Sequence, residues 1–227
     1  MKSAVITFPG SNCDRDMDVA LKKFGFKNKM VWHQDVELPK SDLVVLPGGF
    51  SYGDYLRCGS MASKSKIMQS VINFANSGGM VMGICNGFQI LVETGLVPGV
   101  LLRNKYLEFI CKNVFVKIRN KNSDYFKNIN NEVLELHIAH NEGNYFCTND
   151  QLKEIEDHNQ VAINYCNIDG KIEEKFNPNG SLKNIAGIFN KEKNVLGMMP
   201  HPERMIDPSL SGEDGSLFFN NLINNLK

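Results

Sequence analysis

The first 90 or so residues alternate between short apolar runs and longer amphipathic stretches. Apolar runs bounded by glycine, proline or asparagine predict buried parallel strands, here residues 4–8, 29–32, 42–46 and a run beginning at Val81. Amphipathic spacing predicts one helix after the first strand, capped by Asp14 or Asp16 and ended by Gly25, and a second from about Ser60 to Asn76. The apolar stripes are Val19, Ala20, Leu21 and Phe24 in the first helix and Ile67, Val71, Ile72 and Phe74 in the second.

From Lys112 onward the pattern loosens, and we expect antiparallel strands and loops added to a parallel core. The expected elements are strands at 114–118, 133–138, 161–165 and 195–199, a helix from Asp150 to His158, and turn-rich loops at 119–131 and 171–183. Neither a repeat nor a linker is evident, so we expect a single domain, residues 1–227. The predicted fold class is α/β, with a mostly parallel, doubly wound sheet that binds ligands beyond the carboxyl ends of its strands.

Composition narrows the classes of partner. The chain has 227 residues, 42% of them hydrophobic, and its 25 basic side chains are balanced by 25 acidic ones, so it lacks the basic field that nucleic acid or anionic membranes attract. The six cysteines show no CxxC pair and no regular spacing, which argues against a zinc site and a disulfide framework and fits a reducing cytoplasm. Neither a signal peptide nor a membrane-spanning stretch is evident. We therefore expect a soluble cytoplasmic protein without a metal, a nucleic acid partner or membrane contact.

The stretch from Val81 to Gln89 carries the clearest chemical signal. It predicts a buried strand, a sharp turn with Cys85 between Gly83 and Gly87, and a helix that starts directly after the cysteine. In such an elbow the nucleophile projects from the sheet, and the free N–H groups of the helix favour a thiolate. The alternative is that Cys85 is a small buried hydrophobe, as most free cysteines are. We interpret Cys85 as a nucleophile.

A second signal lies just past the strand at 42–46. Gly48 and Gly49 are adjacent there, and two glycines let the backbone approach a ligand closely and direct its N–H groups toward it. The alternative is a plain flexible turn.

The base is sought among the five histidines. His201 follows the late strand in Pro200-His201-Pro202-Glu203, and the extended backbone that prolines impose places His201 and Glu203 on the same side. A carboxylate there would fix the imidazole tautomer, whereas the alternative is a turn histidine in a proline-rich loop. His33 at a strand end could simply be solvated, His158 lies in a polar stretch, and the His137/His140 pair lacks a third metal ligand. Cys85, His201 and Glu203 thus form a candidate triad for acyl transfer.

Three motifs together resemble the class I (triad) glutamine amidotransferases: residues 83–89, 47–57 and 200–204. Within that family the chain is similar to the glutaminase subunits of phosphoribosylformylglycinamidine synthase, with the run from Phe50 to Arg57 as the specific part and residues 10–16 and 184–188 in agreement. One departure is Ala139-His140-Asn141-Glu142-Gly143, where the subfamily usually has glycine in the middle. Asparagine tolerates a left-handed backbone, so we expect the loop to persist, and the roles of His140 and Glu142 stay open.

The resemblance implies a flavodoxin-like amidotransferase domain that hydrolyses glutamine to glutamate and supplies ammonia for purine biosynthesis. Cys85 would attack the glutamine side-chain amide, with the backbone N–H groups of Gly49 and Asn86 holding the oxyanion. Gln89 would line the glutamine pocket together with the Gly48 loop. Arg57 would help position the site or the partner, while Cys13 and Cys58 have no assigned function.

The same resemblance implies partners. The ammonia would pass to a separate synthetase subunit that acts on formylglycinamide ribonucleotide, with a small bridging subunit in the complex. ATP and Mg²⁺ would be used by that synthetase, because this chain has no G-x-x-x-x-G-K-[ST] phosphate loop and no cofactor is expected on it.

Two other functions are weighed against this one. A cysteine hydrolase or peptidase on the same fold also uses an elbow cysteine, but those relatives usually take their histidine from the position beside it, which is Asn86 here. A non-catalytic binding module that merely kept the fold is disfavoured by the intact triad.

Overall fold

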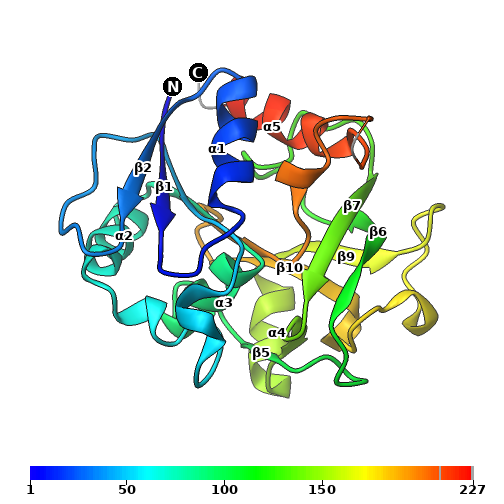
Figure 1. The fold of residues 1–227 in the computed structure, drawn as a ribbon. Helices are drawn as coiled ribbons and strands as arrows, with labels where there is room; N and C mark the ends of the chain where they lie inside the picture. The colour runs from blue at the N-terminus through cyan, green and yellow to red at the C-terminus, as the bar shows by residue number, and fades with distance from the viewer. Residues whose placement is uncertain (210, 226–227) are drawn as a thin grey trace.

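The computed structural model describes residues 1–209 and 211–225. Figure 1 shows a mixed sheet through the middle of the molecule, with α1 (Asp14–Lys23) and α5 (Asp214–Asn225) on one side and α3 (Asn86–Glu93) and α4 (Asn149–Asp157) on the other. The remaining helix is α2 (Lys66–Asn76). The strands are β1 (Lys2–Thr7), β2 (Lys27–Trp32), β3 (Leu43–Leu46), β4 (Met80–Ile84), β5 (Val100–Leu102), β6 (Ile110–Ile118), β7 (Val133–His140), β8 (Asn144–Phe146), β9 (Val161–Cys166), β10 (Ile185–Phe189) and β11 (Val195–Met198).

Nine of these strands form the main sheet, in the order β2-β1-β3-β4-β11-β10-β9-β6-β7. Neighbours from β2 to β11 are parallel, and the pairs from β11 to β7 are antiparallel. The prediction of a parallel core with added antiparallel strands is therefore confirmed. β5 and β8 form a separate two-stranded ribbon.

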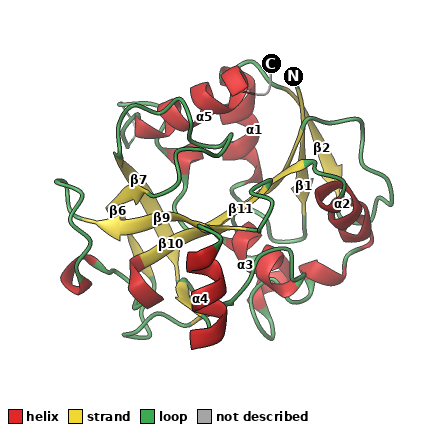
Figure 2. Cartoon of the chain, turned by 180° about the vertical axis from the view of Figure 1, so that it is seen from behind, coloured by secondary structure: helices red, strands yellow, loops and turns green. Residues whose placement is uncertain are grey.

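The inner parallel strands β3 and β4 are apolar on both faces because helices cover both, whereas the edge strand β2 is largely exposed. All four residues of β3 and all five of β4 are buried, which explains why their sequences show no alternation. On the side of α1 and α5, the rings of Phe24 and Phe219 stack with centroids 5.5 Å apart. Figure 2, from behind, shows the same layers and places β11 in the middle of the sheet above α3.

Several expected details of the helices are wrong. The N-cap of α1 is Cys13, with no side-chain cap, and Asp14 and Asp16 lie in the first turn. Val19 is 59% exposed, since the buried stripe runs through Met17 instead. Gly25 does follow the helix end, at φ +90°.

The second helix also differs from its expected range. It begins at Lys66, because Ser65 is extended at ψ 150° and separates it from a short 3₁₀ turn at Ala62–Lys64. The predicted strands and α4 are present with ends shifted by a few residues, whereas β5, β8, β10 and α5 were not expected. No helix within residues 1–209 and 211–225 is long and apolar enough to cross a membrane.

Candidate active site

The turn between β4 and α3 is the sharp elbow that the sequence predicts. Cys85 has φ 50° and ψ −103°, a left-handed conformation that a non-glycine residue adopts only at a cost. Gly87 lies directly against β3, and a Cβ there would clash with the carbonyl oxygen of Leu46. A Cβ on Gly83 would lie 2.6 Å from the carbonyl oxygen of Gly87. Both glycines are therefore needed to bring the helix this close to the sheet.

Cys85 is 4% exposed and is fixed by backbone contacts on both sides. Its N–H donates to Met198 O in β11 at 2.8 Å, and its thiol donates to Ala139 O in β7 at 3.6 Å. The sulfur stands at the N-terminus of α3, whose first N–H groups have no partner within the helix. These groups favour negative charge at this point.

His201 and Glu203 form a buried pair behind Cys85. The Nδ1 atom of His201 lies 2.6 Å from Glu203 Oε1, and the residues are 1% and 3% exposed. The His201 N–H donates to His137 O at 2.8 Å, which ties the loop after β11 to β7. The two side chains meet as predicted, but through a 3₁₀ turn at Pro202–Arg204 and not through the extended backbone expected from the sequence. His201 Nε2 and Glu203 Oε2 are buried without a hydrogen-bond partner among the residues described.

The electrostatics favour a protonated imidazole. Burial alone would lower the pKa of His201, but the charge of Glu203, followed by that of Cys85 and contacts with the Cys13 and Cys85 sulfurs, raises it well above its usual value. The buried carboxylate of Glu203 therefore favours an imidazolium at His201, the form that can give a proton.

The loop after β3 passes directly over the imidazole. A Cβ on Gly48 would lie 2.7 Å from His201 Cε1, so only glycine fits there without displacing the ring. Gly49, at φ +141°, lies in an isolated bridge with Ser11, and its N–H donates no hydrogen bond within the described part of the chain. Gly48 thus packs directly against His201, which a plain flexible turn would not explain.

Asn86 and Gln89 connect the elbow to the loops around it. Asn86 Oδ1 accepts from the Ser51 N–H at 3.2 Å, and its Nδ2 donates to Gln89 Oε1 at 2.8 Å and to Asp54 Oδ1 at 3.3 Å. Gln89 Nε2 donates to Glu142 O at 2.8 Å. Burial, followed by the charge of Glu142, raises the pKa of Asp54 to about 6. Asp54 had no expected role of its own, although it lies in the Phe50–Arg57 run that carries the family resemblance.

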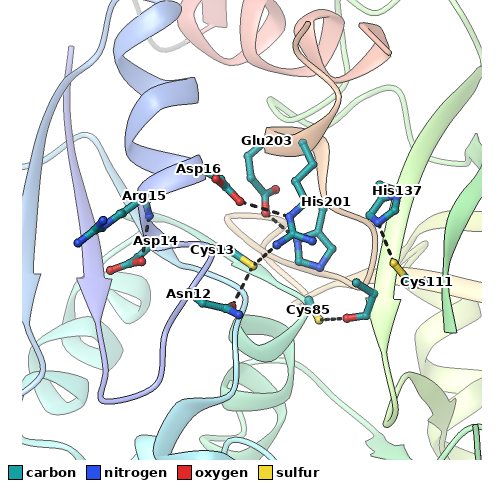
Figure 3. A network of polar contacts seen from close by, with 12 residues as sticks. Asn12, Cys13, Asp14, Arg15, Asp16, Cys85, Cys111, His137, His201 and Glu203 are labelled. Carbon is teal, nitrogen blue, oxygen red and sulfur yellow. Dashed lines mark hydrogen bonds and ion pairs between the residues drawn. The ribbon is translucent and has the colours of Figure 1, made fainter. Parts of the chain in front are cut away.

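Cys13 is the other residue whose position the sequence left open. Figure 3 shows it beside His201 and Glu203, on the turn between β1 and α1. The Cys13 sulfur, a ring nitrogen of His201 and a carboxylate oxygen of Glu203 lie within 4.8 Å of one another. Arg204 Nη2 donates to Cys13 Sγ at 3.2 Å, and the Cys13 thiol donates to Asn12 Oδ1 at 3.4 Å. In the sequence, the position of Cys13 just after β1 could have indicated its place near the elbow, because the carboxyl ends of parallel strands lie at one edge of the sheet.

The other histidines have structural environments. His33 is buried and its Nδ1 lies 2.8 Å from the Tyr52 hydroxyl, so the expectation that it could be solvated is wrong. His140 Nδ1 lies 3.1 Å from Asn104 Oδ1, and burial, followed by the charge of His201, lowers the pKa of His140 to about 3. His158 is exposed, as expected.

Arg57 points toward the far end of α3. Its Nε and Nη2 donate to the two carboxylate oxygens of Glu93 at 2.5 and 2.6 Å, which holds the 50–57 loop against the helix. Among the candidates from the sequence, the structure therefore gathers Cys85, His201, Glu203 and Gly48 at one point and leaves Arg57 outside it.

Comparison with known proteins agrees with this geometry. Residues 1–212 match the family described as CobB/CobQ-like glutamine amidotransferase domain. The chain is 80% identical, over its whole length and that of its relative, to phosphoribosylformylglycinamidine synthase subunit PurQ of Pelagibacter ubique. It is 50% identical to the subunit of the same name from Gloeobacter violaceus, over 98% of this chain and 97% of that one.

Solved structures show the same fold. A structure of PurLQS from Thermotoga maritima superposes with a TM-score of 0.88 at 39% identity, covering 100% of this chain and 99% of the other. A glutamine amidotransferase from the same organism has a TM-score of 0.65 at 17% identity, over 100% and 98% of the two chains, and supports the fold alone. The chain therefore belongs to the glutamine amidotransferase family, in the group of PurQ subunits of phosphoribosylformylglycinamidine synthase.

Proposed function

We propose that this chain is the glutaminase subunit of phosphoribosylformylglycinamidine synthase. It hydrolyses glutamine to glutamate and ammonia, and the ammonia passes to a synthetase subunit that converts formylglycinamide ribonucleotide to formylglycinamidine ribonucleotide. The observation that carries the proposal is the strained elbow of Cys85 beside the buried His201–Glu203 pair, in a chain 80% identical to a subunit of that name.

Cys85 is the nucleophile in this proposal. Its thiolate attacks the side-chain carbonyl carbon of glutamine, and the oxyanion that forms accepts hydrogen bonds from the free N–H groups of Gly49 and Asn86. Each such donor typically contributes about 3 kcal/mol to the transition state. Cys13 is the competing thiol, but it lies on an ordinary turn at φ −96° and lacks the strained elbow of Cys85.

His201 moves the protons. The C–N bond of the tetrahedral intermediate breaks as His201 Nε2 gives its proton to the departing nitrogen, which leaves as ammonia and a γ-glutamyl thioester on Cys85. His201 then takes a proton from water, which attacks the thioester, and the C–S bond breaks to release glutamate. Glu203 keeps Nδ1 bonded throughout and so fixes the tautomer that exposes Nε2. Gln89 shapes the pocket through its bonds to Asn86 and Glu142.

The surface around the site fits a protein partner. Large apolar side chains are exposed on the two loops beside the elbow: Phe50, Tyr55 and Leu56 in one, and Tyr106, Leu107 and Phe109 in the other. Phe50 and Phe109 meet, with ring centroids 6.3 Å apart. We assign this patch to the synthetase subunit, since ammonia must leave the site without reaching bulk water. A small bridging subunit completes the complex, as the PurLQS neighbour suggests.

Two further parts of the proposal rest on the family. ATP and Mg²⁺ act on the synthetase subunit, with no cofactor on this chain. The location is the cytoplasm, which suits six cysteines that are all free thiols.

The test uses Cys85→Ala in the complex reconstituted with its synthetase and bridging subunits. Glutamine-dependent synthesis is expected to disappear while synthesis from added ammonia survives, because only the glutaminase chemistry needs the thiol. The matched control is Cys166→Ala, which removes a buried thiol from β9, and it should retain both activities. Glutamine-dependent synthesis by the Cys85→Ala complex would sink the proposal.

A further inference from the structure

The turn between β1 and α1 packs against two parts of the active site, although the glutaminase mechanism gives it no role. The Cys13 N–H donates to Gly48 O at 3.3 Å, and a Cβ on Gly49 would lie 2.9 Å from Ser11 Cα. A Cβ on Gly48 would meet both the Cys13 sulfur, at 3.2 Å, and His201 Cε1, at 2.7 Å. The turn therefore contacts the loop that carries Gly48 and Gly49, and its sulfur lies close to the imidazole of His201.

Arg204 connects this turn to the turn that carries His201. It ends the 3₁₀ turn Pro202–Arg204, and its backbone N–H donates to His201 O at 3.3 Å. Its side chain crosses to the β1–α1 turn, where Nε donates to Asp16 Oδ2 at 3.3 Å and Nη2 donates to Cys13 Sγ at 3.2 Å. One guanidinium thus joins two segments that lie 188 and 191 positions apart in the sequence.

The shape of the Arg204 guanidinium suits this connection. Its planar fork directs Nε and Nη2 along fixed directions and holds two partners at once, which a lysine ammonium on a flexible chain does not do. The ion pair with Asp16 is partly exposed, at 46% for the Asp16 side chain, and contributes little to stability. The other partner, the sulfur of Cys13, belongs to a residue that is only 3% exposed. The arrangement therefore fixes position more than it stabilises the fold.

Two stretches of the sequence meet in this contact. Residues 10–16 and 200–204 both carry the family resemblance, yet the mechanism uses no residue of the first stretch. Arg204, from the second stretch, contacts Cys13 and Asp16 of the first. The contact gives residues of both stretches a shared task.

The chemistry of His201 depends on where its turn is held. Proton transfer needs a distance of about 2.6–3.2 Å, and a misplacement of about 1 Å costs about 100-fold in rate. Glu203 orients the ring but lies on the same turn, so it does not place that turn relative to Gly49. The carbonyl of His137 holds the turn on the side of β7, and Arg204 holds it on the side of β1.

We propose that Arg204 and Cys13 are positioning residues of the glutaminase, which hold the His201 turn against the β1–α1 turn. The imidazole is thereby fixed relative to the oxyanion donor at Gly49. Neither positioning residue exchanges a proton with glutamine in this role. The inference rests on the proposed glutaminase function, because it concerns the rate of that reaction.

The experiment measures ammonia release from glutamine by the reconstituted complex with substitutions at these two positions. Arg204→Ala should lower kcat about 100-fold with little change in KM, since the imidazole is displaced while the glutamine pocket is kept. Arg204→Lys should remain impaired, because an ammonium does not replace the fork. Cys13→Ala should lower kcat about tenfold, and Cys13→Ser, which keeps an acceptor for the guanidinium, should restore most of the loss.

Arg15→Ala and Cys166→Ala are the matched controls. Arg15 lies in the first turn of α1 but is exposed, and Figure 3 shows it pointing away from His201. Cys166 is a buried cysteine on β9. Both controls should keep the wild-type kcat. Thermal unfolding checks each variant, and if Arg204→Ala does not fold, Arg204→Lys takes its place.

A double-mutant cycle separates a shared contact from two independent losses. The double variant of Arg204→Ala and Cys13→Ala should be no slower than Arg204→Ala alone, because both changes break the same contact. Additive losses, wild-type kcat in the folded single variants, or a raised KM with unchanged kcat would each overturn the proposal. A wild-type complex that releases no ammonia from glutamine would refute the proposed function and this role with it, whereas an active wild type with unaffected variants would refute the role alone.

Discussion

Removing the charge of Glu203 should lower kcat by an amount that can be calculated from the structure. Glu203→Gln keeps the shape of the side chain but removes the carboxylate that lies 2.6 Å from His201 Nδ1. With charge centres about 4 Å apart and an effective dielectric constant of about 20, the pair is stabilised by about 4 kcal/mol. That energy corresponds to a loss of about a thousandfold in kcat.

The pH dependence gives a second readout. Glu203 raises the pKa of His201, so protonated His201 is present below that pKa and is lost as pH rises through it. Removing the carboxylate lowers the pKa, and the alkaline limb of the glutaminase pH profile should move to lower pH. The KM for glutamine should change little, because Glu203 is behind the imidazole.

The assay is ammonia release from glutamine by the reconstituted complex across a range of pH. Glu192→Gln, at an exposed carboxylate that makes no contact with the triad, is the matched control. Thermal unfolding checks that Glu203→Gln still folds. A folded Glu203→Gln enzyme with wild-type kcat and an unshifted alkaline limb would refute the electrostatic role of Glu203.

Two further predictions concern packing and docking. Gly87→Ala should lower the free energy of unfolding, measured in urea, by about 3 kcal/mol, because the added Cβ meets the carbonyl of Leu46. Gly25→Ala should lower it by only about 1 kcal/mol, since nothing lies within 4 Å of the added Cβ. Equal losses would contradict the close approach of α3 to the sheet. Leu56→Asp, at an 86% exposed position, should weaken binding of the synthetase subunit about 30-fold (about 2 kcal/mol). The control Ile168→Asp, at a 68% exposed position, should leave the affinity unchanged. Unchanged affinity of Leu56→Asp would show that the patch is not part of the interface.

The elbow was predictable because its geometry depends on residues close together in sequence. Gly83 and Gly87 flank Cys85, and a side chain at either position would clash with atoms that the tight strand–helix turn brings close. The His201–Glu203 pair was predictable as a contact between residues two positions apart, although the expected reason was wrong: Pro202–Arg204 form a 3₁₀ turn and are not extended. Parallel strands such as β3 and β4 were evident from continuous apolar runs.

What the sequence did not reveal depends on long-range contacts. Cys13 reaches His201 only through the fold, 188 positions along the chain, and no local pattern encodes that approach. The buried face of α1 was misassigned. Packing against the sheet buries Met17 and leaves Val19 exposed, although Val19 is the more apolar residue. α5 was missed although Phe218 and Leu222 lie four residues apart on its buried side.

The most direct test of the account is to identify which cysteine reacts with a glutamine analogue that carries an electrophile in place of the side-chain amide. Cys85 and Cys13 both contact His201, so the choice between them decides the mechanism. Peptide mapping after one equivalent of label should find the modification on Cys85, with glutamine protecting it. Modification of Cys13 with Cys85 unlabelled would contradict the central claim.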